Sequence, residues 1–141
     1  MRHVAVASLC LALLSSAVLV SSPSRAEAQT ATDQAIVEQA RSWIGTPYGA
    51  YGADCSGFTS LIYQEFGAYL PDSPASQYYS GVPSYGEAGD LVFFDEHGYG
   101  ISHVGIATGH GTVIHSSTYY GAVVETPIYL IPGYVGAGDV L

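Results

Sequence analysis

Two stretches of the chain carry apolar residues at helical spacing, and the first covers residues 33–44. Its apolar positions fall on one face: Ile36, Val37, Ala40, Trp43 and Ile44. Thr32 or Asp33 is the predicted N-cap, and the turn residues at 45–47 end the pattern. This spacing predicts an amphipathic helix that packs one side against a core.

The second helical pattern begins at Cys55 and follows a glycine-rich stretch that favours no regular structure. Its apolar residues, Phe58, Leu61, Ile62 and Phe66, recur at i, i+3, i+4 and i+8. Gly67 is placed to end this helix, and Asp54 is the natural N-cap. Cys55 is therefore predicted to lie in the first turn.

The second half of the chain changes to short runs of β-branched and aromatic residues separated by glycine-rich turns. These runs cover residues 89–94, 102–108, 112–117 and 122–128. Their length and spacing predict an antiparallel meander. Helices followed by such a sheet indicate an α+β fold.

The turn at residues 109–111 determines which side chains share a face of this sheet. A hairpin centred there makes His103 and His115 opposite or diagonal neighbours on one face. Gly105 and Ala107 share that face and leave room beside the histidines. The alternate positions, Val104, Ile106 and Ile114, fill the other face.

The N-terminal residues have the character of a targeting segment. An uncharged apolar stretch from Val4 to Val20 follows Arg2 and His3, and small residues stand at Ala26 and Ala28. This pattern predicts a signal peptide at residues 1–28, a secreted product acting in the cell wall or periplasm, and one domain at residues 29–141. Serines weaken the alternative of an uncleaved anchor, and no stable membrane anchor is expected.

Charge and cysteine content narrow the classes of partner. The net charge is −9, and Arg41 is the only Lys or Arg beyond residue 28. Such an acidic chain repels phosphate backbones and anionic lipid, so no nucleic-acid or membrane-surface partner is expected. Cys55 is the only cysteine after residue 28, which excludes an internal disulfide there and indicates a reactive thiol or intermolecular pairing.

The predicted position of Cys55 suggests nucleophilic chemistry. Free N–H groups and the positive end of a helix dipole favour a thiolate, and they can also hold an oxyanion. His103 and His115 on the adjacent sheet would supply a base and its partner. The alternatives are a buried, unreactive cysteine with ordinary polar histidines.

A metal site formed by Cys55, His103 and His115 is a further alternative. The chain has no C-x-x-C or H-x-x-x-H spacing that would support it. No metal and no organic cofactor are therefore expected.

Several motifs occur in an order that resembles a known family. They are the stretch ending in A-D-C-S-G-F, then S-P-A-S-Q-Y-Y, G-D-L-V-F-F, S-H-V-G-I-A-T and I-H-S-S. Together they resemble the NlpC-type family of bacterial cell-wall cysteine peptidases, whose domain is papain-like, with the nucleophile helix packed on an antiparallel sheet. The resemblance implies hydrolysis of γ-D-glutamyl bonds to a diamino acid in peptidoglycan stem peptides or muropeptides, by a monomer.

The resemblance also assigns roles to individual residues. It makes Cys55 the nucleophile, His103 the general base and His115 the residue that orients the base. Tyr48 matches a tyrosine that lines the site and helps to bind substrate or oxyanion. Asp54 and Ser56 match positions that contact the bound peptide. For these last three residues a structural role is an equal alternative.

The chain departs from the family pattern at a few positions. Asp72, Glu87 and Ala88 replace residues that are commonly basic or proline, and Ala107 replaces a larger residue. The carboxylates of Asp72 and Glu87 suggest a substrate with a free amine. Two other functions stay open: a non-catalytic peptidoglycan-binding module, and a papain-like amidase or acyltransferase.

Overall fold

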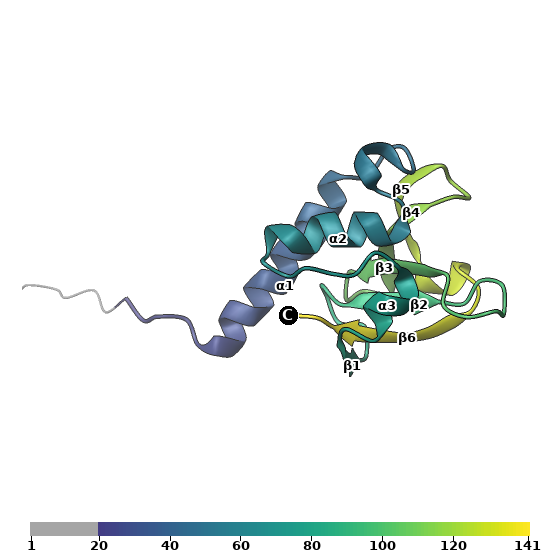
Figure 1. The fold of residues 1–141 in the computed structure, drawn as a ribbon. Coiled ribbons are helices and arrows are strands. Elements are labelled where there is room, and N and C mark those ends of the chain that lie inside the picture. The colour runs from purple at the N-terminus through teal and green to yellow at the C-terminus, as the bar shows by residue number, and fades with distance from the viewer. Residues whose placement is uncertain (1–19) are drawn as a thin grey trace, which may run out of the picture.

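A computed structural model describes residues 20–141 of the chain (Figure 1). The helical segments are α1 (Arg25–Ser42), η1 (Ala50–Gly52), α2 (Cys55–Glu65), α3 (Pro74–Tyr78) and η2 (Ile128–Leu130). The strands are β1 (Val82–Ser84), β2 (Leu91–Phe94), β3 (His103–Ala107), β4 (Thr112–Ser117), β5 (Ala122–Pro127) and β6 (Tyr134–Asp139). Helices therefore precede the sheet, which confirms the predicted α+β class.

The six strands form one antiparallel sheet in the order β1-β6-β2-β3-β4-β5. The predicted meander is confirmed as β2 to β5. The last strand, β6, returns to the far side of β2 and pairs with both β2 and β1. Neither β1 nor β6 was predicted, because β1 has only three residues and contains Pro83, while β6 contains Gly136 and Gly138.

The first helix differs from the prediction at both ends. It begins at Arg25 because a capping box precedes it: the Glu27 N–H donates to Ser24 Oγ (3.3 Å), and the Ser24 N–H donates to the Glu27 carboxylate (2.7 Å). The predicted start near Asp33 is wrong. The helix ends at Ser42, and Ile44, assigned to its apolar face, is 47% exposed.

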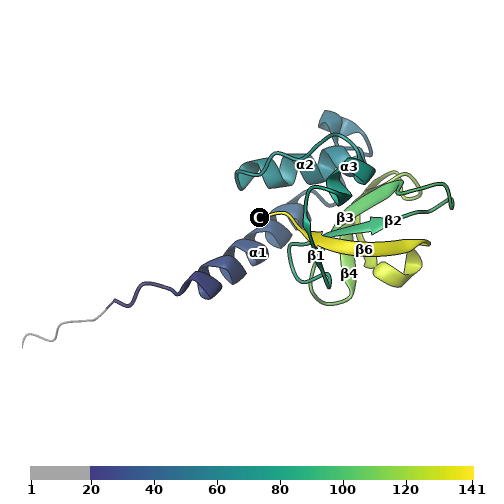
Figure 2. The same ribbon diagram turned by 60° about the horizontal axis from the view of Figure 1, so that its bottom comes forward.

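Only the second half of α1 packs against the rest of the protein. Its buried residues are Ile36, Val37 and Ala40, and both views show the first half projecting from the body (Figures 1 and 2). Residues 1–19 of the predicted signal peptide lie outside the described residues. Its last four residues, 25–28, form the first turn of α1. No helix within residues 20–141 is long and apolar enough to cross a membrane.

Two apolar clusters lie on opposite faces of the sheet. The larger one joins α1 and α2 to the face that carries Val104, Ile106 and Ile114, as the alternation predicted. The smaller one, on the other face, includes Phe94, Ala107 and Val113 and is covered by residues next to η2. The helices thus cover one face, and the histidine positions of β3 and β4 belong to the other.

Candidate active site

The start of α2 is shaped by the residues that surround Cys55 in the sequence. Asp54 is the N-cap, as predicted, and its carboxylate accepts a hydrogen bond from the Gly57 N–H at 2.7 Å. A Cβ at position 57 would stand 1.9 Å from the Gly52 carbonyl oxygen. Only glycine therefore lets the preceding loop approach the helix and place Cys55 in the first turn.

The loop before Cys55 is fastened to the end of the sheet. The Tyr48 N–H donates to the Gly121 carbonyl (2.9 Å), and Pro47 forms a bridge with Ala122. The buried Ser116 hydroxyl donates to the Ala53 carbonyl at 2.7 Å. These bonds fix the position of the α2 N-terminus relative to β4 and β5.

Cys55 lies beside the first residues of β3. Its Sγ is 3.9 Å from the Ser102 carbonyl oxygen, and the Val104 N–H also points toward the sulfur. Ser102 and Val104 are the neighbours of His103 in the chain. The thiol therefore lies beside the backbone of the segment that carries His103, although the helices and the histidine lie on different faces of the sheet.

The thiol of Cys55 is neutral at rest. Burial raises its pKa most, and the Asp54 charge raises it further, while the N–H groups of Ser56, Val104 and Cys55 itself lower it. The net shift is upward. The N–H groups at the helix start thus favour the thiolate, as predicted, but desolvation outweighs them in the resting site.

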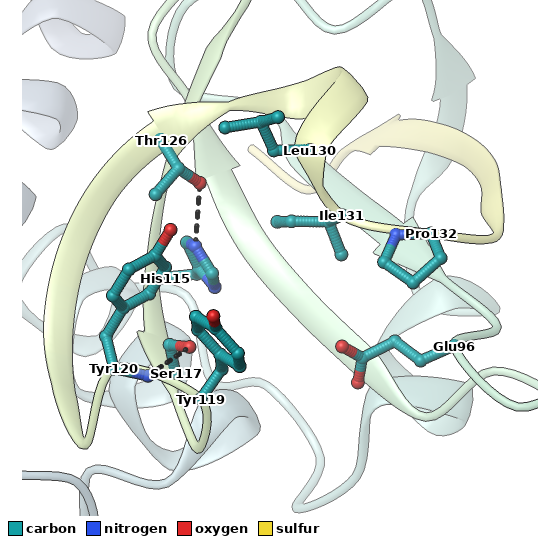
Figure 3. Close-up of a pocket in the computed structure, with 9 residues that line it drawn as sticks. All are labelled: Glu96, His115, Ser117, Tyr119, Tyr120, Thr126, Leu130, Ile131 and Pro132. Carbon is teal, nitrogen blue, oxygen red and sulfur yellow. Dashed lines mark hydrogen bonds between the residues drawn. The ribbon is translucent and has the colours of Figure 1, made fainter.

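The two histidines form a hydrogen-bonded pair. Ile106 pairs with Ile114, so His103 and His115 are diagonal neighbours across β3 and β4, one of the two predicted arrangements. His103 Nε2 lies 2.7 Å from His115 Nδ1. The other ring nitrogen of His115, Nε2, lies 3.0 Å from Thr126 Oγ1 on β5 (Figure 3).

Both imidazoles are buried and neutral. Burial lowers the pKa of His103, an effect that the Glu96 charge partly offsets. Burial and then His103 lower the pKa of His115 to about 3. His115 therefore stays uncharged and can hold only one proton, on either Nδ1 or Nε2.

One arrangement of protons leaves a basic nitrogen facing the cysteine side. If His115 carries its proton on Nε2 and donates it to Thr126, its Nδ1 accepts from His103 Nε2. The lone pair of His103 Nδ1 is then free. In the reverse arrangement His103 carries a proton on Nδ1 and cannot act as a base, so we assign the first one.

Gly105 lets the two strands hold this histidine pair. A Cβ at that position would stand 2.5 Å from Val113 Cγ2 and 2.8 Å from His115 Cβ. The room that the sequence predicted beside the histidines is thus filled by His115 itself.

The other three predicted site residues lie within the same region. Tyr48 is 37% exposed, and burial raises its pKa, followed by the charges of Cys55 and Asp54, while the Cys55 N–H lowers it. Ser56 is buried, with its hydroxyl 3.5 Å from the Asp54 carboxylate. Tyr48 thus faces the nucleophile's side of the site, whereas the Asp54 and Ser56 side chains contact each other and the helix start.

Sequence reasoning missed Gln77, which anchors the nucleophile helix. It is fully buried, its Oε1 accepts from Thr59 at 2.7 Å, and its Nε2 lies 3.0 Å from the Ser56 carbonyl and 2.9 Å from that of Pro71. It lies in the S-P-A-S-Q-Y-Y motif, which gave no hint of this contact. Thr126 was also missed, because only the pairing of β4 with β5 shows that it lies beside His115.

The described residues contain no group of three or more His, Cys, Asp or Glu side chains positioned to hold a metal ion. Cys55, His103 and His115 therefore do not form such a group.

Residues 38–130 match the sequence model of the NlpC/P60 family, a span that includes every site residue described above. The chain belongs to the NlpC/P60 family. The fold agrees, because solved NlpC/P60 structures have the same few helices packed on an antiparallel sheet.

Three similar proteins illustrate this membership. A "probable endopeptidase" of Corynebacterium glutamicum is 45% identical over 113 residues, which are 71% of this chain and 51% of that protein. A "gamma-D-glutamyl-L-lysine dipeptidyl-peptidase" of Bacillus cereus is 32% identical over 110 residues, 71% of this chain and 33% of that protein. The peptidoglycan hydrolase RipB of Mycobacterium tuberculosis superposes with a TM-score of 0.70 at 25% identity, covering 84% of this chain and 69% of RipB. This NlpC/P60 chain thus spans about half or less of the two sequence relatives.

Proposed function

We propose that this protein is a secreted cysteine endopeptidase that cleaves the γ-D-glutamyl bond to the diamino acid of peptidoglycan stem peptides. The observation that carries the proposal is the placement of the Cys55 thiol 3.9 Å from the carbonyl of Ser102, the residue before His103, together with the hydrogen bonds from His103 to His115 and from His115 to Thr126. Membership of a family that includes peptidoglycan hydrolases, and the name of the Bacillus cereus relative, support the choice of bond.

The first step forms an acyl-enzyme. His103 Nδ1 takes the proton of the Cys55 thiol as the sulfur attacks the amide carbonyl, so that the charge appears only during attack. The N–H of Cys55 and the hydroxyl of Tyr48 face the position where the oxyanion forms. His103 then gives the proton to the leaving nitrogen, and the C–N bond breaks.

The second step releases the acyl group. A water molecule gives a proton to His103 and attacks the thioester carbonyl, and the departing sulfur recovers that proton from the imidazolium. His115 accepts from His103 throughout and holds the ring in the required orientation. No further reactant is needed besides the peptide and water.

Two other functions predict different products. An amidase would form its acyl-enzyme with the muramoyl lactyl group, and an acyltransferase would pass the acyl group to an amine. A non-catalytic wall-binding module would release nothing. The presence of Cys55 beside the strand residue that precedes His103, with His103 hydrogen-bonded to His115, favours an enzyme over a binding module.

The test is digestion of disaccharide-tripeptide muropeptides by the purified chain and by its Cys55→Ala variant, with products identified by mass spectrometry. We expect the wild type to release the diamino acid and to leave L-alanyl-D-glutamate on the sugar. The variant should release nothing. Release of the intact peptide from the sugar would instead identify an amidase, and absence of any product from both proteins would contradict an enzymatic role.

A further inference from the structure

A cavity of about 420 Å³ lies beside His115 of the histidine pair. His115 and Thr126 form part of its wall, together with Tyr119 and Tyr120 from the β4–β5 turn and Leu130 near Thr126 (Figure 3). Its volume is that of a small-molecule or side-chain pocket. Cys55 does not line it, so it is not the place where the acyl group is held.

The direction of the reaction indicates what this cavity receives. His103 must protonate the leaving nitrogen, so the part of the substrate that leaves as an amine lies on the histidine side. The acyl part lies on the side of the α2 N-terminus. A cavity beyond His103, lined by its partner His115, therefore faces the residue that follows the scissile bond.

Glu96 gives the cavity its charge. It extends from the β2–β3 loop toward Tyr119 and His115 across the cavity (Figure 3). Among residues 20–141 its carboxylate has no ion-pair or hydrogen-bond partner, while Arg41 is paired with Glu38 and Glu125. Its charge also raises the pKa of His103 and of Tyr48 slightly, so it acts on the same region as the reacting groups.

The loop that carries Glu96 is held in place rather than loosely exposed. The Asp95 carboxylate accepts from the N–H groups of Gly98, Tyr99 and Gly100 at 2.6 to 3.1 Å. The Asp95 N–H donates to the Gly133 carbonyl at 2.7 Å. This last bond joins the Glu96 loop to the segment next to Ile131 and Pro132, so these two parts of the cavity wall are held together (Figure 3).

The remaining lining suits an alkyl chain that ends in a cation. Leu130, Ile131 and Pro132 provide apolar surface, and the rings of Tyr119 and Tyr120 offer faces that attract a cation. We propose that this cavity is the subsite for the diamino acid after the scissile bond, with Glu96 binding its side-chain ammonium. The assignment rests on the proposed endopeptidase function. It attributes the preference for a substrate with a free amine to Glu96, because Asp72 and Glu87 do not line the cavity.

The experiment compares two substrates, L-Ala-γ-D-Glu-L-Lys and the same tripeptide with Nε-acetyl-lysine. A charge-assisted hydrogen bond contributes about 1.5–3 kcal/mol, so the wild type should have roughly 10- to 100-fold higher kcat/KM for the free amine. Glu96→Gln should bring the ratio close to one, mainly by slowing the free-amine substrate. Glu65→Gln, at the far end of α2, is the matched control and should keep the wild-type ratio.

The ratio separates this role from an electrostatic effect of Glu96 on His103, which would change the rate for both substrates equally. Equal cleavage of the two peptides by the wild type, or an unchanged ratio in Glu96→Gln, would overturn the proposal.

A binding measurement keeps the subsite testable even if neither peptide is cleaved and the proposed function fails. L-lysyl-D-alanine, the leaving fragment, is titrated into the Cys55→Ala protein and followed by NMR. Shifts at Tyr119 and Tyr120 that vanish with Nε-acetyl-lysyl-D-alanine and in a Cys55→Ala, Glu96→Gln protein support the site. Equal shifts with both dipeptides, or none, contradict it.

Discussion

The hydroxyl of Thr126 sets the protonation of the histidine pair, and Thr126→Val tests this directly. Valine has nearly the same shape but cannot accept the hydrogen bond that Thr126 Oγ1 receives from His115 Nε2 at 3.0 Å. Thr126 is 8% exposed and His115 is 3% exposed, so their hydrogen bond is largely shielded from bulk solvent. An unpaired buried donor costs about 1–3 kcal/mol.

The loss of this hydrogen bond should also lower kcat. Without Thr126 the His115 proton can move to Nδ1, where it donates to His103 Nε2 and leaves the proton of His103 on the nitrogen that should act as base. If the hydroxyl favours the productive arrangement by about 1.4 kcal/mol, its loss shifts the equilibrium between the two arrangements about tenfold, and kcat falls by up to that factor. KM should change little, because the substrate carbonyl still meets the same Cys55.

Three measurements distinguish this role from simple destabilisation. Urea unfolding gives the change in the free energy of unfolding, peptide hydrolysis gives kcat and KM, and ¹⁵N NMR of the imidazole rings reports which nitrogen is protonated. Thr126→Ser keeps the hydroxyl and is the matched control, with kcat near that of the wild type. A Thr126→Val protein with unchanged kcat and unchanged ¹⁵N shifts would refute the proposed proton arrangement.

Three further predictions concern stability. Gln77→Leu leaves the Ser56 and Pro71 carbonyls without their buried donor, so urea unfolding should show a loss of about 2–4 kcal/mol, and a loss under 1 kcal/mol would contradict its anchoring role. Gly105→Ala forces a Cβ into Val113 and His115, so both the free energy of unfolding, by about 1–3 kcal/mol, and kcat should fall, whereas an unchanged kcat would mean that the histidine pair tolerates the strain. The folded-state pKa of His115 is about 3, below its value in the unfolded chain, so its contribution to stability is complete above pH 6.5 and is lost as the pH falls toward 3. Urea unfolding at several pH values should therefore show a free energy of unfolding that decreases as the pH falls through this range. His115→Asn should reduce the slope of that dependence by up to about 1.4 kcal/mol per pH unit.

Local signals predicted the nucleophile helix well. Asp54 and Gly67, a cap and a stop only a few residues from the apolar pattern, define the ends of α2 to within a residue or two. The His103–His115 pair was also predictable, because a short hairpin turn determines which residues are diagonal neighbours. Both predictions depend on contacts that are close in sequence.

The features that were missed depend on contacts that no local motif or short turn specifies. Strand β6 forms because β2 offers a free edge, and its glycine-rich sequence alone does not favour a strand. Gln77 and Thr126 acquire their roles from partners 18 and 11 residues away. The upward shift in the pKa of Cys55 likewise comes from burial by the assembled fold, which a helix position cannot reveal.

The proposed mechanism requires Cys55 to form an acyl-enzyme with the γ-D-glutamyl group, with His103 as the base. Rapid acid quenching of the purified chain with L-Ala-γ-D-Glu-L-Lys, followed by mass spectrometry of the intact protein and its peptides, tests this requirement. We expect an added mass equal to the L-alanyl-D-glutamyl acyl group on the peptide that contains Cys55, and its absence in Cys55→Ala and His103→Ala. Release of lysine without any adduct at Cys55, or equal release by Cys55→Ala, would contradict the mechanism.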